Sequence, residues 1–407
     1  MELTKLQQEA IEKGVAWFKK EDFSRPFVIA GLAGTGKSSA VKELVVQLGL
    51  TNEDVNFCTF TGKAALVLSR KGNPACTIHR LIYDPTEVEE YISKIDGTKV
   101  SVEEFLKNPD LYKIKTKMVF LKKFMLDPTI KLIIVDEVSM VNAELMRDLM
   151  SFYLPVICLG DPEQLPPVGG ENNGLLHNPD IFLNEIHRQA EGNPIIYLSM
   201  LAREGKRIYP GNYKMNGKSK AVVISKKDGA IPDEALLNSS QVICGRNKTR
   251  HDLNAYIRNL MGFKGKIPNK GEKLVCLKND WTTSLKDIFL INGLIGYVKD
   301  DILNVDFSKK IFRFDYRPDF LEEDYFEGLI GDLRRFTDLK NIDNDDENNR
   351  KDSKANEFDY GYAITCHKSQ GSEWPNLTVY HEYMGDSNSK WLYTAITRSS
   401  NKLILYI

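Results

Sequence analysis

The chain has 407 residues, of which 42% are hydrophobic and 27% are charged, proportions typical of a soluble globular protein with two or three domains. Its 55 basic and 56 acidic residues leave a net charge of -1, which counts against a purely electrostatic binder of nucleic acid. No apolar run is long enough to span a membrane, and segment 1–20 lacks a signal-peptide core. The six cysteines contain no Cys-x-x-Cys pair, which indicates reduced thiols in a cytosolic protein rather than a zinc site.

Strands and helices alternate along much of the chain, which predicts parallel sheets with helices on both faces. Apolar residues at helical spacing predict a first helix over 4–20. Short apolar runs predict buried strands at residues 27–30, 55–60, 132–135 and 156–160.

Two segments interrupt this alternation. Residues 84–128 carry many charges and few strand signals, so we interpret them as an insertion between two strands of the first sheet. A second strand–helix series begins near residue 242 and resumes at residue 358. Between these points, short strand candidates among glycines predict a small β-rich insert over 263–355, and the polar run 341–357 predicts a solvated loop.

Residues 31–38 read GLAGTGKS, the G-x-x-x-x-G-K-[ST] pattern of a phosphate-binding loop. Glycines let backbone N–H groups turn toward phosphate oxygens, and the following helix adds the positive end of its dipole. Lys37 would reach the β- and γ-phosphates of ATP, and the Ser38 hydroxyl would bind Mg²⁺. The residues expected to hold the nucleotide in this loop are Gly31, Gly34, Thr35, Gly36, Lys37, Ser38 and Ser39.

The apolar run 132–135 ends in Asp136 and Glu137, as expected for the second half of a nucleoside triphosphatase site. Asp136 would hold Mg²⁺ through water, and Glu137 would polarise the attacking water. The two motifs together predict ATP hydrolysis, but they do not separate a helicase from other P-loop enzymes.

The run GDPEQLPPVG at residues 160–169 resembles motif III of the superfamily 1B helicases, the branch that includes RecD, the phage helicase Dda and the Pif1 proteins. The resemblance covers nearly the whole chain and is weakest over 84–128 and 299–356. Further segments resemble the other motifs of this family in the family's order, at residues 3–7, 59–65, 77–81, 183–189, 364–373 and 395–398.

This resemblance implies an α/β fold with two RecA-like P-loop domains and ATP in the cleft between them. It also implies a pin-type insertion, called 1B, and an SH3-like β insert, called 2B. The implied division is 1–83 with 129–200 as domain 1A, 84–128 as 1B, 201–262 with 356–407 as domain 2A, and 263–355 as 2B.

The resemblance gives further residues a role at the nucleotide. Gln7 would read the edge of the adenine, and Gln164 would sense the γ-phosphate. Arg188 and Arg398 are the candidate arginine fingers, because an arginine is always charged and stabilises charge that develops during phosphoryl transfer. The residues of the motif V segment expected to face the nucleotide are Gln370, Gly371 and Glu373.

The same motifs imply contacts to single-stranded DNA, since hydroxyl, imidazole and ammonium groups can donate hydrogen bonds to phosphates. The aromatic residues Tyr83, Tyr91, Phe105 and Tyr112 could stack on bases, but none of them is assigned as a wedge. The residues expected to bind DNA are Thr61, Gly62, Lys63, Thr77, His79, Arg80, Asn247, Thr365, His367 and Lys368.

We therefore predict a 5′–3′ DNA helicase that uses ATP and Mg²⁺, moves on single-stranded DNA and acts at junctions with duplex DNA. Its polarity is implied only by the resemblance. The alternatives are a Pif1-type or Upf1-type helicase for RNA or special structures, a P-loop NTPase without a nucleic-acid role, and a clamp without turnover. We expect a monomer in the cytoplasm of a bacterial or phage-infected cell, with no membrane partner and with replication or recombination proteins as candidate partners.

Overall fold

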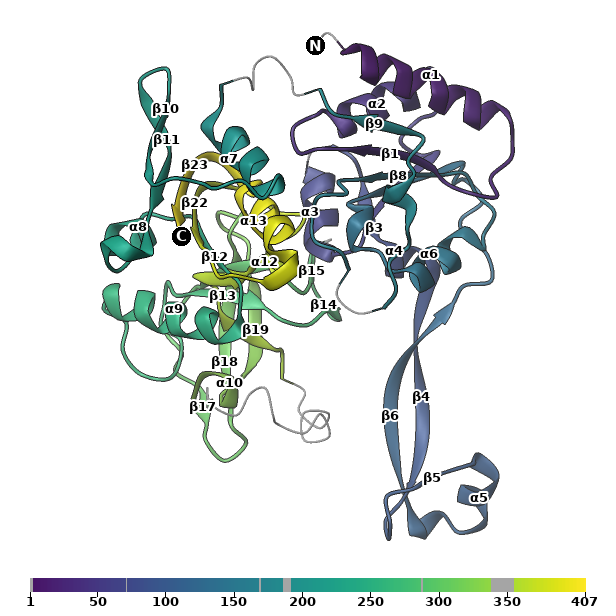
Figure 1. The fold of residues 1–407 in the computed structure, drawn as a ribbon. Coiled ribbons are helices and arrows are strands. Elements are labelled where there is room, and N and C mark those ends of the chain that lie inside the picture. The colour runs from purple at the N-terminus through teal and green to yellow at the C-terminus, as the bar shows by residue number, and fades with distance from the viewer. Residues whose placement is uncertain (1–2, 71, 168–169, 186–191, 287, 338–354) are drawn as a thin grey trace.

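The computed structural model describes residues 3–70, 72–167, 170–185, 192–286, 288–337 and 355–407. Figure 1 shows two lobes, each built on a sheet with helices packed around it, and a long two-stranded arm that projects from the first lobe. No helix in these ranges is both long enough and apolar enough to cross a membrane.

The first lobe contains a six-stranded parallel sheet. The strands are β1 (Phe27–Gly31), β2 (Val55–Thr59), β3 (Ala75–Thr77), β7 (Leu132–Asp136), β8 (Val156–Gly160) and β9 (Ile181–Leu183). The helices are α1 (Lys5–Lys19), α2 (Lys37–Gln47), α3 (Gly62–Arg70), α4 (Ile78–Ile82) and α6 (Ala143–Met150). The strand order is β3-β2-β7-β8-β1-β9. Alternate residues of β7 serve opposite faces, since Leu132 and Ile134 share a core with α1 and α2, whereas Ile133 and Val135 share one with α4 and α6.

The arm lies between α4 and β7, so the chain does insert a segment between two strands of the first sheet. Its strands β4 (Tyr83–Ser93) and β6 (Tyr112–Lys122) pair antiparallel over eleven residue pairs. The tip carries β5 (Lys99–Val100) and α5 (Val102–Lys107). These strands were not predicted, because the mostly exposed side chains of the arm form no buried apolar run, although residues 112–118 alternate between lysines and less polar residues.

The second lobe contains another six-stranded sheet. The strands are β10 (Gly211–Met215), β11 (Lys218–Ile224), β12 (Gln241–Cys244), β21 (Ala363–Thr365), β22 (Trp374–Tyr380) and β23 (Ser399–Tyr406). The helices are α7 (Pro194–Arg203), α8 (Asp233–Leu237), α9 (Asn247–Leu260), α12 (Cys366–Ser369) and α13 (Asn388–Ile396). The order is β10-β11-β23-β22-β12-β21, with β10 antiparallel to β11 and the other pairs parallel.

The predicted end of the first domain at residue 200 falls inside α7. This helix belongs to the second lobe, because Ile195 and Leu198 share a core with Trp391 of α13. The apolar face of α7 therefore decides where the helix packs, and the sequence alone did not reveal which sheet it would cover.

A third, antiparallel sheet is inserted into the second lobe. Its strands are β13 (Lys273–Cys276), β16 (Ile295–Val298), β17 (Val305–Asp306), β18 (Ile311–Pro318), β19 (Phe326–Asp332) and β20 (Phe358–Tyr360). A separate hairpin, β14 (Asp280–Leu285) with β15 (Ile288–Leu290), precedes β16, and the short helix α10 (Arg334–Thr337) follows β19. Strand β20 pairs with β13, so the inserted sheet extends past the predicted boundary at residue 355. Most of the predicted polar loop, residues 341–354, lies outside the described residues.

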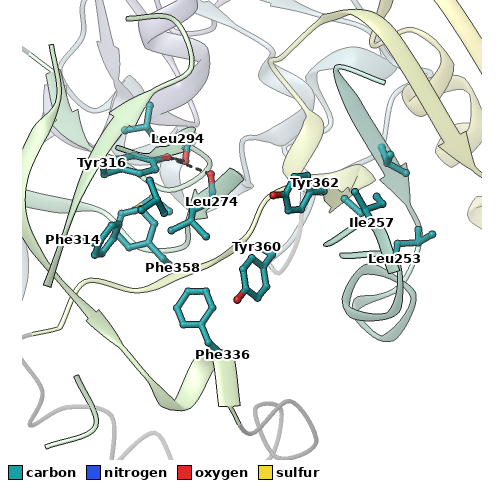
Figure 2. Packing of buried hydrophobic residues seen from close by; sticks show 14 of the residues in the cluster. Leu253, Ile257, Leu274, Leu294, Phe314, Tyr316, Phe336, Phe358, Tyr360 and Tyr362 are labelled. Carbon is teal, nitrogen blue, oxygen red and sulfur yellow. Dashed lines mark hydrogen bonds between the residues drawn. The ribbon is translucent and has the colours of Figure 1, made fainter. Parts of the chain in front are cut away.

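The inserted sheet shares one apolar core with α9 (Figure 2). Phe314, Tyr316 and Phe358 lie together on one side of this core, and Leu253 of α9 lies on the other. The buried Tyr316 hydroxyl donates to the carbonyl of Leu294 at 2.8 Å, so its polar end is satisfied. The insert is thus packed onto the second lobe through a continuous core.

Candidate nucleotide site and nucleic-acid cleft

The turn between β1 and α2 forms the candidate phosphate site. Gly34 and Gly36 have φ angles of 79° and 76°, a region that side chains with a Cβ rarely adopt. No side chain in the described ranges caps α2 at Gly36, so the helix begins with N–H groups suited to an anion. The Lys37 Nζ donates to the carbonyls of Gly31 and Leu32, at 2.7 and 3.0 Å, so it is held beside the loop.

Gln7 holds this loop against α1, and its predicted contact with adenine stays a prediction. Its side chain is 1% exposed. The amide Nε2 donates to the carbonyl of Thr35 at 3.0 Å, and Oε1 accepts from the backbone N of Thr4 at 2.9 Å. Both ends of the amide are therefore engaged in fixing α1 against the phosphate loop.

The acidic pair lies at the end of β7. The Asp136 Oδ1 accepts from the backbone N of Glu137 at 2.8 Å, and Glu137 has a φ of 55°. Arg398, from the second lobe, places one guanidinium nitrogen 3.7 Å from Oε1 of Glu137. The Arg398 side chain is 7% exposed, and it also donates to the carbonyls of Thr394 and Ser372. The structure thus brings two predicted catalytic residues together from opposite lobes.

Gln164 and the candidate metal ligands also fit a nucleotide. The Oε1 of Gln164 is buried and has no hydrogen-bond partner among the described residues, so it could accept from a water beside the γ-phosphate. Ser38 is the second residue of α2, and Asp136 ends β7. No group of three His, Cys, Asp or Glu residues in the described ranges is arranged to hold a metal. A hydroxyl and a carboxylate completed by phosphate oxygens suit Mg²⁺, which usually relies on few protein ligands. The other arginine-finger candidate, Arg188, lies outside the described residues.

Asp161 and Tyr393 form a second link between the lobes, and no role was predicted for either residue from the sequence. The Tyr393 hydroxyl donates to Oδ2 of Asp161 at 2.6 Å and accepts from the backbone N of Ala33 at 3.0 Å. Asp161 is fully buried, and its burial raises the pKa of the carboxyl, whereas the charge of Lys37 opposes that shift. Asp161 belongs to the recognised motif III run, but nothing local signals that it meets Tyr393.

Residues of the motif V segment lie at the same junction. Gln370 is 3% exposed, and its Nε2 donates to the carbonyl of Leu165 at 3.2 Å, while the Leu165 N donates to the hydroxyl of Thr394 at 3.0 Å. A Cβ on Gly371 would lie 2.6 Å from that of Ala64. In this structure Gln370 and Gly371 contact Leu165 and Ala64 of the first lobe, and their predicted place at the nucleotide stays a prediction. Glu373, the third residue predicted there, is exposed.

A cavity of about 1260 Å³ lies among the two lobes and the β14–β15 hairpin. Its lining includes all ten residues predicted to bind DNA, namely Thr61, Gly62, Lys63, Thr77, His79, Arg80, Asn247, Thr365, His367 and Lys368. Aromatic and amide residues that were not predicted also line it, including Phe60, Phe120, Asn279, Phe289, Asn292 and Trp391. We call this cavity the large cleft.

Several polar side chains of the large cleft are uncharged or already contact another residue of the chain. Burial lowers the pKa of both His79 and His367, so these imidazoles are neutral at pH 7. The Arg80 guanidinium lies 4.8 Å from the ring centre of Phe289, and the Lys368 Nζ donates to Asn292 at 3.4 Å. Such a surface suits a ligand recognised by stacking and hydrogen bonding as well as by charge.

Lys63 differs from the other predicted contacts. Its Nζ is buried, has no hydrogen-bond partner among the described residues, and lies 4.8 Å from the ring centre of Trp374. Burial lowers the pKa of Lys63 to about 8. Lys63 thus joins the two lobes through a cation–π contact in this conformation.

The aromatic residues considered for stacking separate into two places. Tyr83 lines the large cleft, and its hydroxyl donates to Asp148. Tyr91 and Phe105 stack on each other at the tip of the arm with ring centres 4.2 Å apart, and Tyr112 meets Phe105 edge-on. The three residues at the tip are therefore engaged in packing the arm.

The two lobes and the phosphate loop between β1 and α2 have the architecture of two RecA-like P-loop domains. Residues 2–222 match the AAA domain family, and residues 360–406 match the UvrD-like helicase C-terminal domain. Since the first match covers more than half of the chain, the chain belongs to the AAA domain family.

The most similar relatives include the ATP-dependent RecD2 DNA helicase of Deinococcus radiodurans, which is 28% identical over 408 residues. That match covers 93% of this chain and 46% of the relative, so the chain spans about half of that protein's length. The RecBCD enzyme subunit RecD of Buchnera aphidicola is 23% identical over 439 residues, with 93% of this chain and 69% of the relative covered.

Solved structures of similar fold include the Pif1 helicase from Bacteroides in complex with ADP-AlF3 and single-stranded DNA. It has a TM-score of 0.51 and 19% identity, and the match covers 100% of this chain and 92% of that chain. A structure of two coordinating Pif1 helicases at forked duplex DNA gives a TM-score of 0.53 with 18% identity, over 100% of this chain and 92% of that chain. These likenesses establish the shared two-domain fold.

Proposed function

We propose that this chain is an ATP-driven motor that moves 5′ to 3′ along single-stranded DNA and opens duplex DNA at junctions. The observation that carries this proposal is the large cleft. Ten residues drawn from separate motifs line that one cavity. Leu165 and Gln370 also line it and are hydrogen-bonded to each other at the junction between the lobes, where the nucleotide residues meet.

At the nucleotide, each lobe supplies part of the chemistry. Lys37 would leave its loop carbonyls for the phosphates, and Glu137 with Gln164 would position the attacking water. Arg398 would stabilise the charge that develops on the γ-phosphate, since its guanidinium already reaches Glu137. Ser38 and Asp136 would hold Mg²⁺, which supplies charge neutralisation at the phosphates when bound.

Motion would follow from the composite nature of this site. Neither lobe alone surrounds the γ-phosphate, so binding of ATP favours the closed arrangement and hydrolysis releases it. Each lobe also contributes residues to the large cleft, for example Thr77 from the first and His367 from the second. If the cleft residues of the two lobes bind the strand tightly in turn, each cycle of opening and closing moves one lobe along the strand.

The nature of the nucleic acid follows from relatives and from the lining of the cleft. One relative is named a DNA helicase, and one structural neighbour holds single-stranded DNA. An aromatic and amide-rich lining with a net charge of -1 for the chain suits stacking of unpaired bases, worth about 1–3 kcal/mol each. The 5′–3′ polarity rests on resemblance to this branch. We propose that the protein acts as a monomer, because both halves of the nucleotide site lie in one chain. The protein partners that we propose are replication or recombination proteins.

The test is the rate of ATP hydrolysis with and without a single-stranded DNA oligonucleotide, with Mg²⁺ present. We expect strong stimulation by DNA and weaker stimulation by an RNA of the same sequence. Equal or stronger stimulation by RNA would move the assignment to an RNA helicase, and hydrolysis that ignores both would contradict a nucleic-acid motor.

A further inference from the structure

We propose that Tyr393 is the positioning residue that transmits the state of the phosphate loop to the large cleft. The inference rests on the proposed function and goes beyond it, because it names one hydroxyl group through which the two sites communicate. Its basis is the position of that hydroxyl between two groups of the first lobe.

At the nucleotide end, the Tyr393 hydroxyl uses both of its hydrogen-bonding capacities. It donates to the Asp161 carboxylate at 2.6 Å and accepts from the backbone N of Ala33, inside the phosphate loop, at 3.0 Å. Tyr393 is 2% exposed and Asp161 is fully buried, so water does not compete for these bonds. A change in the backbone of the loop therefore acts directly on helix α13 of the second lobe.

At the other end, the same helix reaches the large cleft. Trp391, two residues before Tyr393, lines the cleft, and its carbonyl accepts from Sγ of Cys366 at 3.6 Å. Cys366 begins α12, which carries the cleft residues His367 and Lys368. A movement of α13 as a rigid element would thus displace donors in the cleft, which is a continuous physical route between the sites.

A second bond keeps α13 in register with the first lobe. The hydroxyl of Thr394 accepts from the backbone N of Leu165, and Leu165 itself lines the large cleft. Arg398, which follows α13, lies beside Glu137. The Tyr393 hydroxyl is the member of this set that touches the phosphate loop itself, so its removal should disconnect the loop while the helix stays packed.

The chain offers a matched control in Tyr256. Its hydroxyl donates to Oδ1 of Asp233 at 2.7 Å, which reproduces the Tyr–Asp pair, but its side chain is 44% exposed and both residues lie in the second lobe. Tyr393→Phe and Tyr256→Phe each delete one hydroxyl and keep the ring. They differ in whether the lost bond joins the lobes.

The experiment measures two quantities for each variant: the ratio of ATPase kcat with and without a single-stranded DNA oligonucleotide, and the change in DNA Kd caused by a non-hydrolysable ATP analogue. Because both effects depend on the bond between the phosphate loop and α13, Tyr393→Phe should reduce both, and the change in DNA Kd should shrink by about tenfold. Tyr256→Phe should change neither. A general loss of stability would lower the ATPase rates with and without DNA by the same factor, and the ratio of the two rates would not change.

Asp161→Ala provides a second route to the same bond in case Tyr393→Phe folds poorly, because it removes the acceptor of the Tyr393 hydroxyl. It should reproduce the loss of coupling, and the double variant should be no worse than either single variant. Wild-type coupling in Tyr393→Phe or in Asp161→Ala would overturn the proposal. A wild-type enzyme without DNA stimulation would instead contradict the proposed function, so the two failures are distinguishable.

Discussion

The turns β1–α2 and β12–α9 hold equivalent places in the two lobes, because β1 and β12 are each second from one edge of a sheet. The first turn leaves the start of α2 without a side-chain cap at Gly36. The second turn is closed by Glu382, whose carboxylate accepts from the backbone N of Gly245 at 2.8 Å, from that of Arg246 at 3.0 Å and from the Thr249 hydroxyl at 2.7 Å.

Both turns present the positive end of a helix dipole, which attracts an anion. In the first lobe that anion can be a phosphate, and in the second lobe it is the chain's own carboxylate. The comparison explains how two sheets of similar design give one nucleotide site. The second lobe contributes side chains such as Arg398 to the site of the first, rather than a phosphate loop of its own.

The largest expected effect comes from removing the cation of the first turn. Lys37→Ala should reduce ATP hydrolysis below detection, because no other side chain of the phosphate loop carries positive charge to the phosphates. DNA binding in the absence of ATP should remain measurable by fluorescence anisotropy. Normal turnover in this variant would contradict the assignment of the β1–α2 turn as the phosphate site.

Removal of the arginine that the second lobe supplies should have the next largest effect. Arg398→Ala should lower kcat by about 10³-fold, since it deletes charge stabilisation at the γ-phosphate. Arg398→Lys should restore little, because an ammonium lacks the planar fork of a guanidinium. If the alanine variant kept more than a tenth of the wild-type kcat, the second lobe would not complete the site through this residue.

The second turn should matter for stability and not for nucleotide chemistry. Glu382→Ala leaves two backbone N–H groups and a hydroxyl without their acceptor, which should lower the free energy of unfolding by about 2 kcal/mol. Urea denaturation measures this change, and Glu382→Gln should lose less because its amide oxygen still accepts. A variant as stable as the wild type would show that the carboxylate is not what closes this turn.

A third turn, β2–α3, sharpens the comparison, because a buried cation lies at its helix start. The pKa of Lys63 is lowered to about 8 by burial, so between pH 8 and its ordinary value of 10.5 the unfolded chain binds more protons than the folded one. This residue's contribution to the free energy of unfolding therefore rises with pH across that window. Lys63→Met should be more stable than wild type at pH 7, with an advantage about 2 to 3 kcal/mol smaller at pH 10.

Denaturation at both pH values measures that difference. Lys273 also has a pKa lowered to about 8 by burial, but it is present in both proteins and cancels in the comparison. An advantage that is equal at pH 7 and pH 10 would mean that the Lys63 ammonium is solvated in the folded protein.

Local patterns predicted the parts of the site that are contiguous in the chain. The phosphate loop and the Asp136–Glu137 pair could be recognised because each depends on a strand and the turn directly after it. The roles of Glu382 and Tyr393 could not, since their partners Gly245 and Asp161 are 137 and 232 residues away in the sequence. Their bonds exist only after the sheets have formed.

Other differences have equally physical causes. The motifs placed Gln7 and Gln370 near the right loops, but an amide can donate or accept in several directions, and only the packed structure decides which partners it finds. The arm strands β4 and β6 were not predicted because they carry many charged residues and no buried apolar run marks them, although the lysines of β6 alternate with less polar residues over 112–118. By contrast, every residue predicted to bind DNA lines the large cleft. Each of these motifs ends a strand or begins a helix on the same side of its sheet.

The most direct test of the central claim is unwinding of a DNA duplex that carries a single-stranded tail at either the 5′ or the 3′ end, with ATP and Mg²⁺. If the composite nucleotide site and the large cleft act as one motor of this branch, the 5′-tailed duplex should be opened and the 3′-tailed duplex should stay intact. Unwinding from the 3′ tail would contradict the polarity. ATP hydrolysis without unwinding of either substrate would contradict the helicase account itself.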